Sequence, residues 1–364
     1  MASFEFSNIR ISGISTVVPE NKVDMVSFGS QYGEDTVNKI IKGTGIRYAH
    51  RASYYQTATD LGYEAAKRLL DEYSIDRSKI GIMVFVTQSP DYRRPSSASV
   101  LHGKLGLSQK CAALEINLGC SGFVYGLQTI ASMMSCSDVD NALLILGETA
   151  SKLTNVKDRS TNLLYGDAGS ALLLEKGDAK RVIKGGLFSD GNRYRAIILP
   201  AGGFRDMNPP RNEIECEDGN YRSLYDIHMN GTDVFSFTIT DVPKSINEFL
   251  NENKMDINCF DVVVLHQANE FIIKQLIRKF KLSKDKVPVS LDRYGNTGGI
   301  SIPLTLCDKY GDKDYGVQSV FSSGFGIGLS WGIATFEIDT RKVLPIVETE
   351  YYDKNGILSL DDIK

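Results

Sequence analysis

Three polar residues that lie far apart in the chain have side chains suited to acyl-transfer chemistry: Cys120, His266 and Asn296. A cysteine can act as a nucleophile, a histidine can donate a proton, and an amide is a hydrogen-bond donor that cannot ionise. Each of the three lies in a polar turn next to a predicted strand or helix. In an open α/β sheet, such turns lie outside the carboxyl ends of the strands, where ligands bind. We therefore expect the three residues to converge at one site.

Cys120 is predicted to lie where a strand turns into a helix. The mostly apolar segment 111–116 predicts a buried strand, and apolar residues at helical spacing over 124–134 predict a helix. Flanking glycines permit a tight bend between the two. Backbone N–H groups and the helix dipole at such a turn are expected to lower the pKa of the thiol and favour the nucleophilic thiolate. The alternative is a small, buried and inert cysteine.

His266 and Asn296 occupy two further turns. His266 follows the apolar strand predicted over 260–265, and Asn296 lies in the glycine-rich turn 294–301. Each has a structural alternative, because an isolated histidine can be held by a backbone partner and an asparagine tolerates left-handed turn geometry. Only the three residues together indicate catalysis.

The composition is that of an ordinary globular protein. The chain has 364 residues, 42% of them hydrophobic and 24% charged, which suggests two domains or one duplicated domain. A net charge of −4 gives no sign of nucleic-acid binding. We find neither an apolar run approaching the ~20 residues of a membrane span nor a secretory signal pattern. Six scattered cysteines form no disulfide framework or metal-binding pattern, so we expect a cytoplasmic location.

Predicted strands and helices alternate twice along the chain, with the two halves meeting between 175 and 230. This order favours a layered α/β protein built from two similar halves. Residues 202–225 show little apolar periodicity and predict a long surface excursion. The predicted strands are 9–18, 80–87, 142–148, 165–174, 260–266, 317–324 and 325–338, and the predicted helices are 59–70, 95–105, 124–134, 234–250 and 269–280.

From about residue 9 to 338, the sequence resembles β-ketoacyl-acyl-carrier-protein synthase III, the initiating condensing enzyme of the thiolase superfamily. The resemblance implies a thiolase-like layered αβαβα sandwich of two similar halves, and a homodimer. The implied units are residues 1–175 with the cysteine, 176–341 with the histidine and asparagine, and a peripheral tail over 342–364. The motifs that carry it are 117–122, 266–269, 294–299, 44–47, 158–161, 165–169, 229–231 and 325–328.

The resemblance also implies a reaction, a decarboxylative Claisen condensation. Cys120 would take an acyl group from an acyl-CoA primer, and malonyl-acyl carrier protein would supply the extender. The N–H of Cys120 and one from the turn at Gly326 and Ile327 would form an oxyanion hole. His266, as a neutral donor, and Asn296 would bind the thioester carbonyl of the extender. No metal or redox cofactor is implied, since coenzyme A enters only as a substrate thioester.

By the same resemblance, four further residues would contact the substrates. Arg47 and Arg159 would line the mouth where the coenzyme A nucleotide lies, and Asn269 would contact the pantetheine arm. Guanidinium groups suit phosphates, although each arginine could instead be a solvated surface charge. Arg94 stands before Pro95, at a position that is often apolar in the family and reaches the partner subunit's acyl pocket. A cation is costly against a bare alkyl chain, which argues against a simple acetyl primer.

Several other reactions compete with this one. A degradative thiolase would need a second cysteine within 322–326, and a hydroxymethylglutaryl-type synthase would need a glutamate near 88–91; neither is there. A cysteine protease shares the order Cys, His, Asn but not its local Cys-Gly-Ser-Cys-Trp signature. An acyl-Cys acyltransferase that forms an ester or amide stays open, as does a condensing enzyme of a specialised pathway with a non-acetyl primer. A catalytically silent dimer partner would be expected to have lost one of the three residues.

Overall fold

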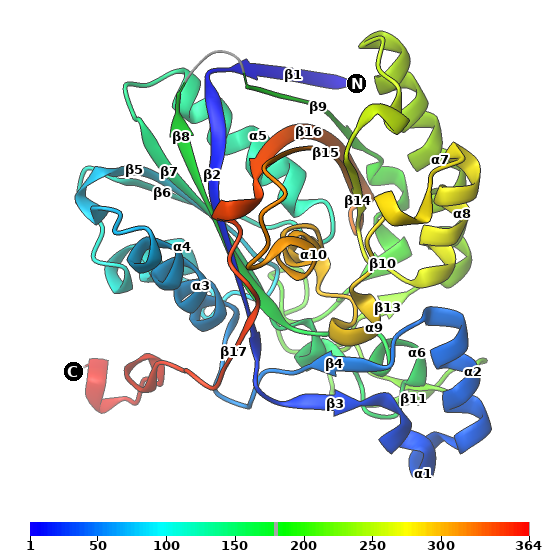
Figure 1. Cartoon of the computed structure of the whole chain (residues 1–364). Coiled ribbons are helices and arrows are strands. Elements are labelled where there is room, and N and C mark those ends of the chain that lie inside the picture. The colour runs from blue at the N-terminus through cyan, green and yellow to red at the C-terminus, as the bar shows by residue number, and fades with distance from the viewer. Residues whose placement is uncertain (178–180, 364) are drawn as a thin grey trace.

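Two mixed β-sheets form the framework of the protein, whose computed structural model describes residues 1–177 and 181–363 (Figure 1). The six-stranded sheet has the order β17-β2-β8-β7-β5-β6, and the five-stranded sheet has the order β1-β9-β16-β15-β14. The strands of the first sheet are β2 (Ile9–Pro19), β5 (Ile80–Val86), β6 (Ala112–Ile116), β7 (Asn141–Glu148), β8 (Ala168–Lys176) and β17 (Val347–Thr349). Those of the second are β1 (Ala2–Ser7), β9 (Val182–Ser189), β14 (Val262–Leu265), β15 (Val317–Gly326) and β16 (Ser330–Asp339).

Helices cover both faces of each sheet, so the protein has five layers (Figure 1). Helices α5 (Gly122–Ser135) and α10 (Ser301–Tyr310) lie between the two sheets. Helices α3 (Ala58–Glu72) and α4 (Ser97–Lys104) cover the outer face of the six-stranded sheet, and α7 (Gly231–Glu252) and α8 (Glu270–Phe280) cover that of the five-stranded sheet. Three hydrophobic clusters fill the spaces between these layers. The predicted αβαβα sandwich is confirmed.

Smaller elements connect the layers. The short helices are α1 (Gly29–Tyr32), α2 (Glu34–Thr44), α6 (Arg159–Asn162) and α9 (Leu291–Tyr294). The short strand pairs are β3 (Lys22–Asp24) with β4 (Tyr48–His50), β10 (Ile197–Ile198) with β13 (His228–Met229), and β11 (Ile214–Glu215) with β12 (Tyr221–Arg222). Among the described residues, no helix is both long and apolar enough to cross a bilayer.

Two predictions about strands are wrong. The segment 111–116 does not form a buried strand, because β6 lies at the edge of its sheet, where Leu114 is 40% exposed. The segment 325–338 is not a single strand, because β15 extends to Gly326 and β16 begins at Ser330. The two strands pair as an antiparallel hairpin. Its turn places Ile327 beside the predicted nucleophile.

Each end of the chain adds a strand to the sheet that is formed mainly by the opposite half of the chain. Strand β1, from the start of the chain, pairs with β9 in the five-stranded sheet, and β17, from the tail, pairs with β2 in the six-stranded sheet. Farther along the tail, Tyr92 Oη donates a hydrogen bond to the carbonyl of Gly356 at 2.5 Å. The division at residues 175 and 176 stays a prediction.

The excursion over 202–225 lies largely on the surface, as predicted. Its hairpin β11–β12 is attached to the segment before α6 by charged contacts. Lys157 Nζ lies 2.6 Å from Glu213 Oε2, and Arg222 Nε lies 2.7 Å from Oδ2 of the buried Asp158. The excursion is therefore an ordered addition to the surface.

Candidate active site

Cys120 lies in the turn that joins β6 to α5, directly before the N-cap residue Ser121. The β15–β16 hairpin closes over this turn, and Ser121 Oγ lies 2.7 Å from Ser330 Oγ. A Cβ added to Gly326 would lie only 2.8 Å from the Cys120 sulfur. Glycine is therefore required at 326 for the hairpin to approach the sulfur this closely.

The environment of the Cys120 sulfur opposes ionisation. The residue is partly exposed, but its sulfur is surrounded by protein, and this burial raises the pKa of Cys120 to about 12. Hydrogen bonds from the backbone N–H groups of Ile327 and Cys120 itself lower this pKa, whereas the nearby Glu148 raises it. The prediction of a lowered thiol pKa is therefore wrong, because desolvation outweighs the backbone donors. At neutral pH the residue is a thiol.

His266 follows β14 and is 1% exposed. Its Nδ1 lies 2.8 Å from Ser301 Oγ, and its backbone N–H donates to the carbonyl of Ser323 at 2.9 Å. Burial lowers the pKa of His266 to about 4, although a backbone hydrogen bond with Gly298 opposes this shift. The imidazole is thus neutral at neutral pH, as expected for the predicted donor.

Asn296 lies in the turn between α9 and α10 and is 5% exposed. Its backbone N–H donates to the carbonyl of Leu164 at 2.9 Å, and its carbonyl accepts from the N–H of Gly166 at 3.1 Å. Its side-chain Oδ1 accepts from the N–H of Gly298 at 3.0 Å. With the oxygen engaged in this way, Nδ2 is the group left to donate to a ligand.

The segments that carry the three residues contact one another. Gly298 hydrogen-bonds both to the Asn296 amide and to His266. A Cβ added to Gly299 would lie 2.6 Å from the carbonyl oxygen of Gly119, next to Cys120 in sequence. The ring of Phe325, which precedes Gly326, lies 5.5 Å from the His266 ring, centroid to centroid. The structure therefore places the three turns around one site, and the catalytic roles stay predictions.

The predicted coenzyme A contacts already have partners within the chain. Arg47 and Asp24 form an ion pair, with Nε 2.8 Å from Oδ1. Arg159 Nη2 donates to the carbonyl of Asp218, in the excursion, at 2.5 Å. Asn269 caps α8, since its Oδ1 accepts from the N–H of Ile272 at 2.9 Å. A coenzyme A molecule would have to compete with these contacts or share them.

Arg94 is exposed on the loop between β5 and α4. Its neighbours are held by two different segments: Tyr92 by the tail, and Arg93 by the excursion, where its guanidinium lies 5.7 Å from the centre of the Phe204 ring. The tail and the excursion thereby hold the part of the loop that directly precedes Arg94.

Two residues of this site, Ser301 and Glu148, were not predicted from the sequence. Ser301 is the hydroxyl partner of the His266 ring, and Glu148 is a buried acid near Cys120. The sequence does contain a signal for Glu148 as a site residue, since it is a carboxylate at the end of the apolar run 142–147. Ser301 had none, because its contact with His266 depends on the fold.

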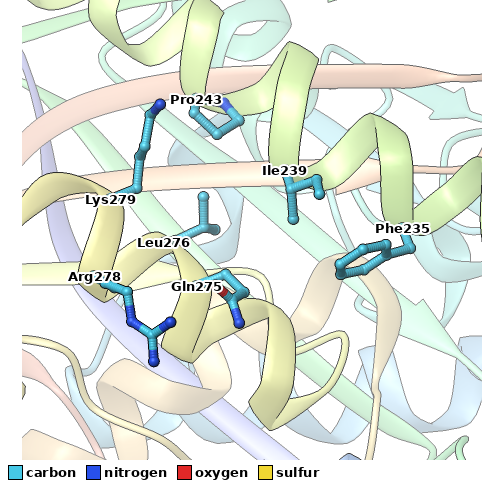
Figure 2. Close-up of a pocket in the computed structure, with 7 residues that line it drawn as sticks. All are labelled: Phe235, Ile239, Pro243, Gln275, Leu276, Arg278 and Lys279. Atoms are coloured by element: carbon cyan, nitrogen blue, oxygen red, sulfur yellow. The ribbon is translucent and has the colours of Figure 1, made fainter.

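A separate groove of about 500 Å³ lies between α7 and α8, and none of its lining residues belongs to these turns (Figure 2). It has an apolar floor with two cationic side chains along one side, and it is lined by Phe235, Ile239, Pro243, Gln275, Leu276, Arg278 and Lys279. Among the described residues, no group of three or more His, Cys, Asp or Glu side chains is arranged to hold a metal ion.

Comparisons with known proteins agree with the fold and the motifs. The family model for 3-oxoacyl-[acyl-carrier-protein] synthase III matches residues 114–191, and the model for its C-terminal part matches residues 250–338. A putative 3-oxoacyl-[acyl-carrier-protein] synthase 3 of Campylobacter jejuni is 32% identical over 351 residues, which cover 93% of this chain and 97% of that protein. A β-ketoacyl-[acyl-carrier-protein] synthase III of Streptococcus pneumoniae is 32% identical, with 89% and 97% covered.

The comparison with solved structures points to the same family. The crystal structure of a 3-oxoacyl-(acyl-carrier protein) synthase from Burkholderia xenovorans matches with a TM-score of 0.90 and 32% identity, covering 95% of this chain and 99% of that one. The fold and motifs thus define a condensing enzyme of the thiolase superfamily. Within that class, the chain belongs to the 3-oxoacyl-[acyl-carrier-protein] synthase III family. It is an enzyme, a transferase of the ketoacyl synthase type.

Proposed function

We propose that this enzyme condenses an acyl-CoA primer with malonyl-acyl carrier protein through an acyl-Cys120 intermediate, as a step of fatty acid biosynthesis or of a related specialised pathway. The observation that carries the proposal is the sulfur of Cys120 packed against Gly326, with the N–H of Ile327 directed at it. The turns of His266 and Asn296 contact the same region, and both side chains can donate hydrogen bonds.

In the first half-reaction, the Cys120 sulfur attacks the carbonyl carbon of the acyl thioester. The carbonyl oxygen becomes an oxyanion, which the N–H groups of Cys120 and Ile327 stabilise. When the intermediate collapses, the bond to the coenzyme A sulfur breaks, and that sulfur leaves with the proton lost by the thiol. Because the pKa of Cys120 is raised, this proton is lost only as the new bond forms.

In the second half-reaction, the malonyl thioester carbonyl binds to His266 and Asn296. The bond to the carboxylate breaks, CO₂ leaves, and the electron pair forms an enolate that the two donors stabilise. The enolate carbon then attacks the acyl-Cys120 carbonyl, the C–S bond breaks, and the sulfur takes up a proton from solvent. A neutral His266 and a non-ionising Asn296 suit this step, since neither has to change charge. Over the two half-reactions, the two thioesters and one proton are consumed, and the β-ketoacyl thioester, CO₂ and free coenzyme A are released.

The groove between α7 and α8 is the surface on which we place the carrier protein. Its apolar floor and the exposed cations Arg278 and Lys279 complement an acidic amphipathic helix (Figure 2). Phe271 stands next to Phe235, one of the residues that line this groove. It is 48% exposed, and its ring lies 5.6 Å from that of Phe235, which makes the docking surface more apolar.

The enzyme would act as a homodimer in the cytoplasm. Strand β6 lies at the exposed edge of its sheet. The unpaired backbone groups of an edge strand can pair with a strand of another chain, so a second copy of the protein can bind here. The six cysteines are all free, which fits a reducing compartment. In such a dimer, Arg94 would reach the partner's acyl pocket and favour a primer with a polar or anionic group over acetyl.

Intact-protein mass spectrometry after incubation with a panel of acyl-CoAs tests this function. We expect an acyl adduct that maps to Cys120, is absent from Cys120→Ser, and becomes a β-ketoacyl product when malonyl-acyl carrier protein is added. An adduct that never turns over with this extender would instead favour the ester- or amide-forming acyltransferase. No adduct with any member of the panel would contradict the proposal.

A further inference from the structure

Glu148 is a buried acid that the proposed reaction does not use. It ends β7 and is 6% exposed. Its Oε1 accepts a hydrogen bond from the N–H of Gln88 at 2.6 Å, and its Oε2 lies 2.9 Å from Ser89 Oγ. Ser89 Oγ also accepts from the N–H of Thr149 at 2.9 Å. The carboxyl thus joins the end of β7 to the loop that follows β5.

This loop borders the turn of the nucleophile. Gln88 Nε2 donates to Asn117 Oδ1 at 3.2 Å, and a Cβ added to Gly119 would lie 2.4 Å from Gln88 Oε1. On the other side, a Cβ added to Gly298 would lie 3.6 Å from Glu148 Cγ. Glu148 therefore lies between the turn of Cys120 and the turn of Asn296.

The Glu148 carboxyl can keep its two contacts in either protonation state. As a carboxylate it accepts both hydrogen bonds; as a neutral acid it accepts one from Gln88 and donates one to Ser89 Oγ. Burial and, to a smaller extent, the nearby Asp167 raise the pKa of Glu148 to about 8 against the hydrogen bonds from Gln88 and Ser89, so its charge changes near neutral pH. The titratable groups that face it are Asp167, Cys120 and Tyr165.

We propose that Glu148 is a positioning residue through which the reactivity of Cys120 depends on pH. In its neutral form it holds the two turns in place without opposing loss of the thiol proton, and as a carboxylate it opposes formation of the thiolate. The inference rests on the proposed role of Cys120 as the nucleophile.

The test is the rate at which iodoacetamide alkylates Cys120 between pH 6.5 and 9.5, followed by mass spectrometry of the Cys120 peptide in the full-length enzyme. In Glu148→Gln, the amide can accept from Gln88 and donate to Ser89, so it imitates the neutral acid. We expect the ratio of variant to wild-type rate to be near one at pH 6.5. By pH 9 the wild-type Glu148 is a carboxylate that raises the pKa of the Cys120 thiol. If this shift is about one unit, the wild type has about tenfold less thiolate than the variant, so the ratio should rise to the order of tenfold. A ratio that stays constant over this range would overturn the inference.

Two further variants keep the test decisive. Ser89→Ala removes a hydrogen bond that lowers the pKa of Glu148. It should therefore move the break in the wild-type pH profile to higher pH, and an unmoved break would count against the inference even if Glu148→Gln does not fold. Glu115→Gln is the matched control, because the Glu115 carboxyl also accepts a backbone hydrogen bond, from Ala98 at 3.1 Å. Its rate ratio should stay at one. The alkylation uses no acyl substrate, so it can be read even if the proposed condensation fails.

Discussion

Burial of Cys120 has two opposite consequences for its chemistry. It keeps the sulfur protonated at neutral pH, which protects it from oxidants, because the thiolate is the reactive form. It also makes the hydrogen bonds from the N–H groups of Ile327 and Cys120 stronger than they would be in water. The same donors that only partly offset the raised thiol pKa can therefore stabilise the oxyanion of the acyl-transfer step.

At the residue scale, Gly326→Ala should slow the acylation of Cys120 strongly. The new methyl group would start 2.8 Å from the sulfur and force the hairpin away, which removes the Ile327 donor. We expect the acylation rate, measured by mass spectrometry, to fall by at least about 100-fold. Gly191→Ala is the control, because a Cβ there meets nothing within 4 Å. Equal acylation rates in the two variants would show that the position of the hairpin does not affect the reaction of the Cys120 sulfur.

The buried His266 should make stability depend on pH. Its folded pKa of about 4 lies below its unfolded value, so the unfolded chain binds more protons between about pH 4 and 6.5. The stabilisation is therefore present above pH 6.5 and is lost as the pH falls toward 4. Urea unfolding at pH 7 and pH 4.5 should show a loss that is larger in the wild type than in His266→Gln by roughly 1–3 kcal/mol. The same loss in both proteins would refute the assignment.

At the element scale, the excursion hairpin depends on one buried ion pair. Arg222→Met would leave Asp158, whose side chain is 1% exposed, without its main partner. We expect the free energy of unfolding to fall by about 3 kcal/mol, because Asp158 would be left as a buried charge without its cation. The exposed pair of Lys157 and Glu213 is the control: Lys157→Met should leave the free energy of unfolding almost unchanged. Equal losses would contradict this account.

Most elements could be predicted because their signals are local. The start of α3 is an example, since Thr57 and Asp60, which are three residues apart in sequence, form a capping box there. The edge position of β6 could not be predicted, because a strand's place in a sheet depends on pairing with distant segments. The hairpin turn after Gly326 was hidden for a similar reason, as its apolar run continues without a break.

The site was likewise predictable only where its signals are local. Cys120, His266 and Asn296 each lie in a short motif beside a strand or helix, so sequence alone could single them out. The thiol pKa of Cys120 could not be predicted, since it depends on how tightly the hairpin covers the sulfur. The Ser301 contact and the position of Glu148 between two turns likewise arise only when the layers pack.

At the scale of the whole molecule, the exposed edge at β6 leads us to expect a dimer. Leu114→Glu would place a charge on this edge and should give particles of 40.2 kDa, where the wild type gives twice that mass in light scattering. Leu360→Glu is the control, because Leu360 is 81% exposed on the tail and its substitution should leave the dimer intact. A Leu114→Glu protein that stays dimeric would place the interface elsewhere.

The central claim is that Cys120, His266 and Asn296 form one condensing site in which the two half-reactions use different residues. The most direct measurement is release of CO₂ from malonyl-acyl carrier protein by enzyme already acylated on Cys120, compared among the wild type, His266→Ala and Asn296→Ala. We predict that both variants carry the acyl adduct but release CO₂ at least about 100-fold more slowly than the wild type, since each lacks one donor to the enolate. Release at the wild-type rate from either variant would contradict the account.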